Sequence, residues 1–396
     1  MSHERCDLLV VGAGPAGCAA GIIAARAGLR VLVLDRATFP RPKTCGDAVS
    51  NRASAIIDEL TGQPEALRRI PHAEVRAGAA VFPDGSRVVH RFDDAPGFIV
   101  PRLHLDDLLR AALEHAGAHL RQGIKVRRLT THHGRTTGAE ADGLTVHAQA
   151  VIAADGPGSL AWTACGIPYR RGPQLAVAIT AYHRNVDFGS DTATNEHYFE
   201  PDLPCGYGWI FPAVEGLSNI GVYQRADHFG AHRHTLPELL QRFVAAHPER
   251  LASSTAHGRL RTWALPIMTR PWPPAGPGLL TCGDAAWAID PLSGEGIYQA
   301  LHSGTLAART AVRALTGRGQ GWGWGKDRGR GIDERVALRY RLKCIANLGL
   351  TALTRCGIQH AMVPLVERGW YRRPWVRRLL SQGYGSETFE VSKHLH

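Results

Sequence analysis

The sequence lacks the hydrophobic segments that mark secreted and membrane-spanning proteins. No stretch approaches about 18 uninterrupted apolar residues, the length that suggests a membrane-spanning helix. The first residues, MSHERCDLLVVGAGPAG, have no basic region ahead of an apolar segment and no cleavage site, so they are not typical of a signal peptide. We therefore expect a cytoplasmic protein without a spanning helix.

The cysteines also lack a recognisable pattern. The eight cysteines are Cys6, Cys18, Cys45, Cys165, Cys205, Cys282, Cys344 and Cys356. They include no CxxC, and their spacing indicates neither a disulfide framework nor a zinc site. This usage is consistent with a reduced cytoplasmic protein.

The charge is concentrated at one end of an otherwise ordinary globular composition. The 396 residues, of which 44% are hydrophobic and 20% charged, are enough for a large core and more than one domain. The net charge is +11, and residues 334–380 hold ten Arg or Lys and two Glu, a net +8. Such a basic segment attracts nucleic acid, acidic lipid or an anionic substrate or carrier. Because the rest of the chain is close to neutral, we expect no nucleic-acid partner.

The stretch CDLLVVGAGPAGCAAGIIAARAGLRVLVLDR predicts a dinucleotide-binding unit. An apolar strand leads into a GxGxxG turn, an alanine-rich helix follows, and a second apolar strand ends at Asp35. Gly12 allows the tight turn, Gly14 lets a pyrophosphate approach the backbone, and Gly17 lets helix and strand pack closely. The pyrophosphate would lie on the helix N-terminus, and Asp35 would bond a ribose hydroxyl. This unit does not by itself choose between FAD and NAD. Its expected cofactor contacts are Gly12, Gly14, Pro15, Ala16, Gly17, Asp35 and Arg36.

Two later motifs have the form of flavin-binding segments. AVIAADGPGSLAW contains an apolar strand that runs into Asp155 and Gly156. GLLTCGDAAWAIDPLSGEGIYQALHSG contains another strand, then Gly283 and Asp284, then a glycine-rich turn that opens a helix near Gly294. Together with the first unit, these motifs resemble the FAD-binding fold shared by aromatic hydroxylases, flavin halogenases and geranylgeranyl reductases.

That resemblance implies FAD as the cofactor. In the shared fold, the aspartate that matches Asp284 bonds the flavin ribityl chain. The helix near Gly294 points its N-terminus at the flavin pyrimidine edge, where a positive helix end stabilises the anionic reduced flavin. Arg102, placed between an apolar strand and a helix expected to start near Leu105, matches an arginine near the FAD phosphates; a surface arginine is the other interpretation. The further contacts implied are Cys45, Gly46, Asp155, Gly156, Gly283, Pro291, Gly296 and Ile297.

Three shorter motifs narrow the resemblance to the geranylgeranyl reductase family of FAD-dependent oxidoreductases. KTCGDAVS is similar to the lysine-x-cysteine-glycine loop of that family, GYGWIFP to its Tyr-x-Trp-x-Phe-Pro motif, and DPLSGEGIYQAL to its Asn-Pro-Leu-Thr-Gly-Glu-Gly-Ile motif. Asp290 and Ser293 replace the usual Asn and Thr, and Asp47 stands where Gly is often found. Together, these motifs and the general flavin motifs cover most of residues 1–310.

The KTCGDAVS loop is the expected catalytic segment, with Cys45, Lys43 and Asp47 as the candidate residues. In reductases of the family, the cysteine that matches Cys45 lies near the isoalloxazine ring and the substrate alkene. Reduction of an alkene needs a hydride from flavin N5 and a proton, which a thiol near a cation would supply, and Lys43 would lower the pKa of that thiol. Asp47 would oppose the anionic reduced flavin or bond a substrate hydroxyl or amine. The alternative for Cys45 is a small residue that packs the loop.

The GYGWIFP segment predicts a strand that ends in a turn. Its alternation points Tyr207, Trp209 and Phe211 to one face, which is either core or the wall of an apolar pocket. The resemblance makes this face, together with Pro212, the wall of the substrate pocket above the flavin.

Two other segments carry weaker signals. DHFGAHRH brings together His228, His232 and His234. No further ligand is evident and Gly230 weakens a helix, so we expect no metal. The glycine-rich, basic stretch 316–331 is expected to be a flexible linker; an RNA-binding segment is the other interpretation.

The C-terminal segment, 332–396, is expected to be helical as far as the residue before Pro364, which kinks or ends the helix. Trp370, Tyr371 and Trp375 lie among arginines, a mixture that suits a membrane interface. The alternatives are a lid that packs on the substrate domain with a solvated basic face, which we favour, and a docking surface for an acidic carrier.

These patterns predict an α/β protein with a Rossmann-like FAD-binding domain, an interleaved substrate domain with a mixed β-sheet, and a C-terminal helical cap. The FAD-binding pieces are expected at 1–72, 98–165 and 262–315. The substrate domain is expected at 73–97 and 166–261.

The leading hypothesis is an FAD-dependent oxidoreductase that reduces C=C bonds of a lipophilic, isoprenoid-like substrate by hydride transfer from reduced flavin. The first alternative is a monooxygenase, in which a C4a-hydroperoxyflavin acts on an aromatic, peptide or natural-product substrate. A flavin halogenase comes third, because Lys43 is a poor match for the lysine that a halogenase needs.

The expected partners are small molecules. NAD(P)H or another reductant is expected as electron donor, and because no second GxGxxG is present, it would bind without its own Rossmann domain. The substrate is expected to be lipophilic or aromatic, free or bound to a peptide or carrier. Peripheral membrane contact through the basic C-terminal segment is a further expectation, and the sequence carries no firm signal for oligomeric state.

Overall fold

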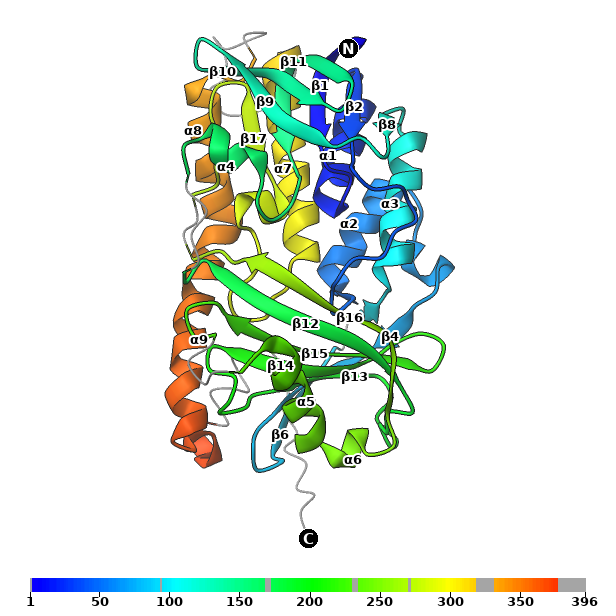
Figure 1. The fold of residues 1–396 in the computed structure, drawn as a ribbon, viewed down its shortest axis with the longest axis vertical. Helices are drawn as coiled ribbons and strands as arrows, with labels where there is room; N and C mark the ends of the chain where they lie inside the picture. Colours follow the sequence, from blue (N-terminus) through cyan, green and yellow to red (C-terminus); the bar gives the residue numbers. More distant parts are fainter. Residues whose placement is uncertain are drawn as a thin grey trace.

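Two large β-sheets, one above the other in Figure 1, form the frame of the protein. The structure is a computed structural model that describes residues 2–92, 95–167, 172–229, 234–269, 272–317 and 331–376. The upper sheet carries the nucleotide-binding unit, and the lower sheet lies beneath the loop ends of the upper one.

The upper sheet has the order β8-β2-β1-β11-β10-β9, with β17 paired to β11. Its strands are β1 (Ser2–Val11), β2 (Val31–Leu34), β8 (His119–Arg121), β9 (Val126–His132), β10 (Arg135–Ala141), β11 (Leu144–Ala153) and β17 (Leu279–Thr281). The pairs among β8, β2, β1, β11 and β17 are parallel, whereas β9, β10 and β11 form an antiparallel meander. The three flavin-type motifs follow β1, β11 and β17, so they meet at one edge, where the carboxyl ends of parallel strands gather.

The apolar run in β1 is explained by burial on both faces. Leu8 and Val10 face one hydrophobic cluster, and Leu9 and Val11 face another. Because successive side chains of a strand alternate, a strand buried on both sides reads as a continuous apolar run.

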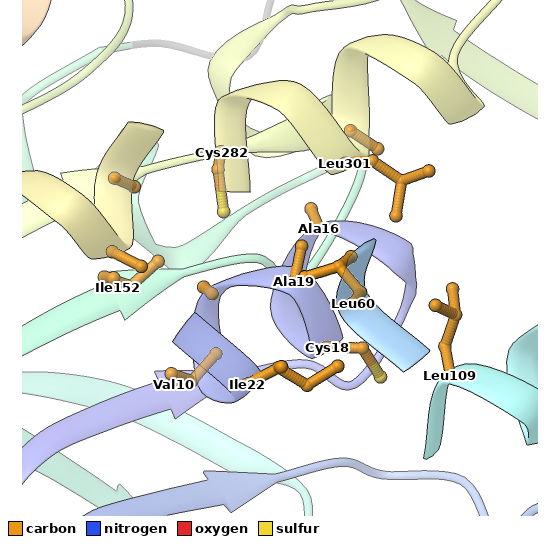
Figure 2. Packing of buried hydrophobic residues seen from close by; sticks show 14 of the residues in the cluster. Val10, Ala16, Cys18, Ala19, Ile22, Leu60, Leu109, Ile152, Cys282 and Leu301 are labelled. Atoms are coloured by element: carbon orange, nitrogen blue, oxygen red, sulfur yellow. The ribbon is translucent and has the colours of Figure 1, made fainter. Parts of the chain in front are cut away.

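Helices cover the face to which Leu8 and Val10 belong. They are α1 (Pro15–Arg26), α2 (Asn51–Thr61), α3 (Arg102–His115), α7 (Ile297–Thr316) and α8 (Glu334–Cys344). Figure 2 shows buried side chains of α1, α2, α3 and α7 packed beside those of β1 and β11; the labelled residues are Val10, Ala16, Cys18, Ala19, Ile22, Leu60, Leu109, Ile152, Cys282 and Leu301. Shorter elements nearby are α4 (Leu160–Ala164), η1 (Ala66–Arg69) and η2 (Gly283–Ala286).

The lower sheet has the order β16-β12-β15-β14-β13-β5-β6. Its strands are β5 (Ala77–Val81), β6 (Arg87–Arg91), β12 (Leu175–Arg184), β13 (Thr194–Tyr198), β14 (Gly206–Pro212), β15 (Leu217–Arg225) and β16 (Thr255–Pro266). One face packs against α5 (Leu236–Ala246) and α6 (Pro248–Leu251). The other face carries Tyr207, Trp209 and Phe211 and turns toward the upper half (Figure 1).

A small antiparallel sheet joins the two halves. It consists of β3 (Ala48–Val49), β7 (Gly97–Ile99) and β4 (Ala73–Val75). Because β3 begins directly after the KTCGD residues, this sheet holds the far end of the loop that carries Cys45.

The C-terminal helices run along one side of both halves (Figure 1). A π-helical turn, η3 (Ile345–Gly349), links α8 to α9 (Leu350–Glu367), and η4 (Trp370–Arg372) follows. Of the two expectations for Pro364, the end of the helix is wrong, because α9 continues to Glu367, and the kink stays a prediction. Pro364 lacks only its own N–H, and its carbonyl still accepts a hydrogen bond from the N–H of Arg368 at 3.0 Å.

The predicted fold class is confirmed: the structure is a mixed α/β protein of the FAD-binding type with a second sheet between the flavin segments. Strand β16 of the lower sheet continues past residue 262 to Pro266, and the predicted domain borders stay a prediction. Most of the expected linker, and residues 377–396 of the expected cap, lie outside the described residues. Among the helices that are described, none is both long and apolar enough to cross a bilayer.

Candidate active site

One large cavity lies where the two halves meet. Its volume is about 1090 Å³, at the upper limit of the ~300–1,000 Å³ typical of sites for small ligands and cofactors. Its lining comes from the GxGxxG turn, the loop that carries Cys45, the two later motifs and the inner face of the lower sheet. Segments that are far apart in the sequence therefore form one site.

The turn between β1 and α1 has open space on its cavity side. Gly12 has a φ of +97°, and a Cβ there would overlap the backbone of Ala154; a Cβ on Gly17 would overlap the carbonyl oxygen of Gly12. A Cβ on Gly14 would meet nothing within 4 Å, and Gly14 lines the cavity. Helix α1 begins at Pro15 without a side chain that caps its free N–H groups. This helix end is therefore open to an anion.

Asp35 lies at the end of β2, as predicted. Its buried carboxylate accepts hydrogen bonds from the N–H groups of Ala13 and Ala37, both at 2.7 Å. A carboxylate has about four lone-pair positions, so Asp35 can accept further hydrogen bonds from a ribose.

Most of the predicted cofactor contacts line this cavity. Those that do so are Gly12, Gly14, Pro15, Ala16, Asp35, Arg36, Cys45, Gly46, Arg102, Asp155, Gly156, Gly283, Asp284, Gly294, Gly296 and Ile297. Gly17 and Pro291 are not among the lining residues. Gly17 instead packs against Gly12, and the carbonyl of Pro291 accepts a hydrogen bond from the hydroxyl of Tyr223 at 3.3 Å.

Two aspartates follow the later strands. Asp155 accepts a hydrogen bond from the N–H of Leu160 at 2.8 Å, and burial raises the pKa of its carboxyl. Burial also raises the pKa of Asp284, against the opposing effect of Lys43 and Arg102. Asp284 lies between these cations and the end of β17, where it can bond hydroxyls of a bound ligand.

The turn before α7 differs slightly from the prediction. The helix begins at Ile297, three residues after Gly294, because Asp290 organises an extra turn. Its Oδ1 accepts hydrogen bonds from the N–H and hydroxyl of Ser293 at 2.8 and 2.9 Å. Its Oδ2 pairs with Arg355 of α9 at 2.8 Å. The replacement of the usual Asn by Asp thus comes with a cation that balances the added charge.

These residues fit FAD. The open end of α1 suits the pyrophosphate, Asp35 suits ribose hydroxyls, and Asp284 suits the hydroxyls of a ribityl chain. The cavity continues past Asp284 along the inner face of the lower sheet, so it offers space for a second molecule.

Arg102 is a buried ion-paired residue, and the interpretation as a surface arginine is wrong. It is the first residue of α3, which therefore begins three residues earlier than Leu105. Its guanidinium binds both oxygens of Asp106, at 2.6 and 2.8 Å, and Asp106 also pairs with Arg41 at 3.0 Å. Although burial opposes its charge, the Asp106 carboxylate raises the pKa of Arg102 above its ordinary value. The guanidinium also contacts Cys45.

The expected depression of the thiol pKa is wrong in its net sign. Burial raises the pKa of Cys45, and Arg102 and Lys43 only partly offset this effect. Burial and Arg102 lower the pKa of Lys43 itself, whose Nζ lies 4.3 Å from the centre of the Trp263 ring. The thiol therefore keeps its proton at neutral pH.

Asp47 does not lie where the sequence interpretation placed it. It is absent from the lining of the cavity and is 1% exposed, beneath the loop. Its Oδ2 accepts hydrogen bonds from the Tyr182 hydroxyl and, at 2.9 Å, from Nδ2 of Asn219. Burial raises the pKa of Asp47 to about 6. The carboxylate faces the lower sheet rather than a ligand because these two partners come from β12 and β15.

The aromatic residues of β14 stand on the inner face of the sheet. Tyr207, Trp209 and Phe211 line the cavity, whereas Pro212 does not. A Cβ on Gly46 would lie 3.3 Å from the Phe211 ring and 3.6 Å from Nε1 of Trp209. The cysteine loop and the aromatic wall are therefore in direct contact.

Several site residues escaped the sequence analysis. They are Arg41 and Asp106 beside Arg102, Trp263 and Arg355 on the cavity wall, and Tyr182 and Asn219 beneath the loop. Two features of the sequence could have indicated some of these residues. Arg102 and Asp106 are four positions apart on one helix, a spacing that favours an ion pair, and Asn219 is a polar residue inside an apolar strand, which needs hydrogen-bond partners.

The histidines give no sign of a metal site. Among the described residues, no cluster of three or more His, Cys, Asp or Glu side chains could hold a metal ion. His232, one of the three histidines considered above, lies outside those residues.

Comparison with known proteins identifies relatives for most of the chain. Residues 5–324 match a family model described as FAD binding domain. The menaquinone reductase of Mycobacterium tuberculosis is 34% identical over 316 residues, which cover 77% of this chain and 76% of that protein. The digeranylgeranylglycerophospholipid reductase 1 of Methanopyrus kandleri is 32% identical over 317 residues, covering 78% and 81% respectively.

Solved structures share the fold. A geranylgeranyl bacteriochlorophyll reductase-like protein from Thermoplasma acidophilum superposes with a TM-score of 0.76 at 23% identity, covering 96% of this chain and 91% of that one. A flavin-dependent brominase superposes with a TM-score of 0.75 at 17% identity, covering 96% and 93%. At these identities the likeness concerns the fold alone.

Gly14→Val should abolish FAD binding without unfolding the protein. Gly14 has φ −69° and ψ −178°, which any residue adopts, and its missing Cβ faces the cavity. The valine side chain would fill the space that a pyrophosphate needs. We expect colourless protein, judged by its visible absorbance, with a circular dichroism spectrum and a Tm equal to those of FAD-free wild type.

Gly17→Ala is the matched control for that experiment. Its Cβ would overlap the Gly12 carbonyl oxygen, and overpacking of this kind costs about 1–3 kcal/mol. We expect this variant to lower the Tm even without FAD. A yellow Gly14→Val protein with full flavin content would contradict the assigned site.

Proposed function

Because the chain belongs to the geranylgeranyl reductase family of FAD-dependent oxidoreductases, we propose that it reduces C=C bonds of a lipophilic, isoprenoid-like substrate. The observation that carries the proposal is the contact between the Cys45 loop and the aromatic wall of β14 inside one cavity. Menaquinone and digeranylgeranylglycerophospholipid, which the names of the two relatives contain, are both lipids with isoprenoid chains.

The wall opposite the nucleotide motifs suits an apolar chain. Tyr207, Trp209 and Phe211 present rings to the cavity, and such rings bury a large apolar area with little loss of conformational entropy. Gly221 opposite them has no side chain, and a Cβ there would overlap the Trp209 ring. The indole therefore lies flat on the sheet and leaves the cavity open for a hydrocarbon.

Cys45 is the proposed proton donor. When bound, reduced FAD supplies a hydride. The reduced C=C bond also needs a proton. The thiol of Cys45 holds one at neutral pH, because burial raises its pKa. After the proton leaves, the thiolate is stabilised by the guanidinium of Arg102, which contacts it, and by Lys43. This pair of cations lets the thiol release the proton despite its burial.

The electron donor is proposed to be NAD(P)H or another reductant. The sequence has one GxGxxG motif, and the structure places it where FAD fits. A donor would therefore reach the flavin through the same cavity.

Cys45→Ala should retain FAD and lose most of its turnover. Loss of a general acid typically costs about 10²–10⁴-fold in rate. The assay is anaerobic, with chemically reduced protein and a lipid that carries a geranylgeranyl chain, and mass spectrometry follows the gain of two hydrogens. Cys165→Ala is the control, because Cys165 is a half-buried cysteine outside the cavity lining.

Two outcomes would change this assignment. Full activity of Cys45→Ala removes the thiol as proton donor. An oxygenated or halogenated product in air, with no product under anaerobic conditions, replaces the reductase with one of the two alternative flavin enzymes.

We also propose that the C-terminal helices rest on an anionic membrane surface. Seven of the ten large exposed apolar side chains in the described part of the chain lie between residues 338 and 375: Leu338, Leu342, Leu350, Leu353, Ile358, Trp370 and Trp375. We call this set the C-terminal apolar face. Arginines lie among these residues in the sequence, and aromatic rings among arginines suit the headgroup region. Because Arg355 of α9 lines the cavity, the same helix borders both this face and the substrate site.

Leu350→Gln combined with Leu353→Gln should weaken membrane binding by at least about tenfold, since burying one leucine is worth about 1.5–3 kcal/mol. The two leucines are 62% and 46% exposed, so the fold should not change. The measurement is co-sedimentation with phosphatidylglycerol vesicles and with phosphatidylcholine vesicles. Leu103→Gln, on α3 and 37% exposed, is the control. Binding by the double variant equal to wild type, or no binding of wild type to either vesicle, rejects this surface.

A further inference from the structure

Asn219 of β15 uses all the hydrogen-bonding capacity of its side chain. It is fully buried, at 0% exposed. Its Nδ2 donates to the carbonyl of Cys45 at 2.8 Å and to Oδ2 of Asp47 at 2.9 Å. Its Oδ1 accepts from Nε1 of Trp209 at 2.9 Å and from the hydroxyl of Thr180 at 2.8 Å. An amide has two donor hydrogens and two acceptor lone pairs, so none is left over.

The chemistry of the four partners determines how the amide is oriented. A carbonyl and a carboxylate oxygen accept hydrogen bonds, and an indole N–H only donates. The nitrogen must therefore face Cys45 and Asp47, and the oxygen must face Trp209. If the amide were rotated by 180°, its oxygen would face the Cys45 carbonyl and the Asp47 carboxylate, and its NH₂ group would face the indole N–H of Trp209.

The two sides of Asn219 belong to different parts of the site. On one side is the loop, whose residue Asp47 has a φ of +62° and is further held by Tyr182 and by the N–H of Val100, which donates to its carbonyl at 2.9 Å. On the other side is Trp209, in the middle of the aromatic wall. One buried side chain thus joins the backbone of the candidate proton donor to the candidate substrate pocket.

We propose that Asn219 is a positioning residue that sets the distance of Cys45 from the aromatic wall. The assignment of Cys45 as proton donor rests on the proposed function, but the positioning of the loop by Asn219 does not. Asn219 is not itself part of the cavity lining, and its hydrogen bonds reach the Cys45 carbonyl and Asp47 rather than the reacting thiol, so it acts on Cys45 through the loop backbone.

An amide is the side chain that this place requires. Aspartate has nearly the same shape but no donor, so it would leave the Cys45 carbonyl unpaired and set a second carboxylate against Asp47. Alanine would remove the partner of the Cys45 carbonyl and of Nε1 of Trp209, whereas Asp47 would keep Tyr182 and Thr180 would keep the carbonyl of Ile220. Unpaired buried polar groups are costly.

The test is the rate at which Cys45 reacts with iodoacetamide in the FAD-loaded protein, followed by peptide mass spectrometry at fixed alkaline pH. We expect Asn219→Asp to raise this rate about tenfold, because a loop that loses one or two buried hydrogen bonds opens more often. Ser218→Ala, the adjacent buried residue on the opposite face of β15, should leave the rate within twofold of wild type.

An exchange of the two side chains separates the two hydrogen bonds. In Asp47→Asn with Asn219→Asp, the new amide can donate to the new carboxylate, while the Cys45 carbonyl stays unpaired. A rate that stays raised in the exchange variant assigns the positioning to the Cys45 carbonyl. A return to the wild-type rate assigns it to the contact with residue 47. Both interpretations apply only if Asn219→Asp alone raises the alkylation rate of Cys45. A rate in Asn219→Asp within twofold of wild type overturns the proposal.

Trp209→Phe covers the case in which Asn219→Asp does not fold. It removes one donor to Oδ1 and keeps an aromatic ring, so a smaller rise in the Cys45 rate is expected, and no rise overturns the proposal. In turnover assays, Asn219→Asp should lower kcat with little change in KM, since the pocket lining is intact. A changed alkylation rate without any reductase activity in wild type would reject the proposed function and leave the positioning role in place.

Discussion

The first turn of α1 lies so close to its neighbours that glycines from distant parts of the chain surround it. A Cβ on Gly17 would overlap the carbonyl of Gly12, and a Cβ on Gly304 of α7 would overlap the carbonyl of Ala16. Gly283, at the end of β17, would crowd the Ala16 side chain in the same way. These are contacts with backbone or with the shortest side chain, so they leave no freedom to adjust. The start of α1, the end of β17 and the helix α7 are therefore held together, and the first and third motifs open into one cavity.

The electrostatics of the cavity follow from burial around that frame. The buried pair Arg102 and Asp106 forms a cluster with the half-buried Arg41 beside the cysteine loop, so that two cations share one carboxylate. The surplus positive charge lies against Cys45, yet burial still raises the pKa of that thiol. The result is a neutral thiol next to a cation, a combination that stores a proton and stabilises the thiolate once the proton has left.

The site exists only where the two halves of the protein meet. The upper sheet brings the helix ends and aspartates, and the lower sheet brings the aromatic wall. The loop between them is fastened to the lower sheet by Asn219 and Tyr182 and to the upper half through Arg102. Helix α9 then lines one side of the cavity with Arg355, and its exposed residues Leu350, Leu353 and Ile358 belong to the C-terminal apolar face.

The amino-acid sequence was enough to predict the features that depend on short-range pattern. It predicted the β1–α1–β2 unit, the two later motifs at strand ends, the strand that turns Tyr207, Trp209 and Phe211 to one face, and the family. The fold in three dimensions added what local pattern leaves open: Asp47 turns away from the cavity, Arg102 is buried, the pKa of Cys45 rises, and α9 runs past Pro364. The direction of Asp47, the burial of Arg102 and the pKa of Cys45 depend on groups far apart in the chain; Asp47 and Asn219, for example, are separated by 172 residues. A local pattern reports periodicity and backbone preference, whereas burial and long-range hydrogen bonds arise only when the two sheets close around the loop.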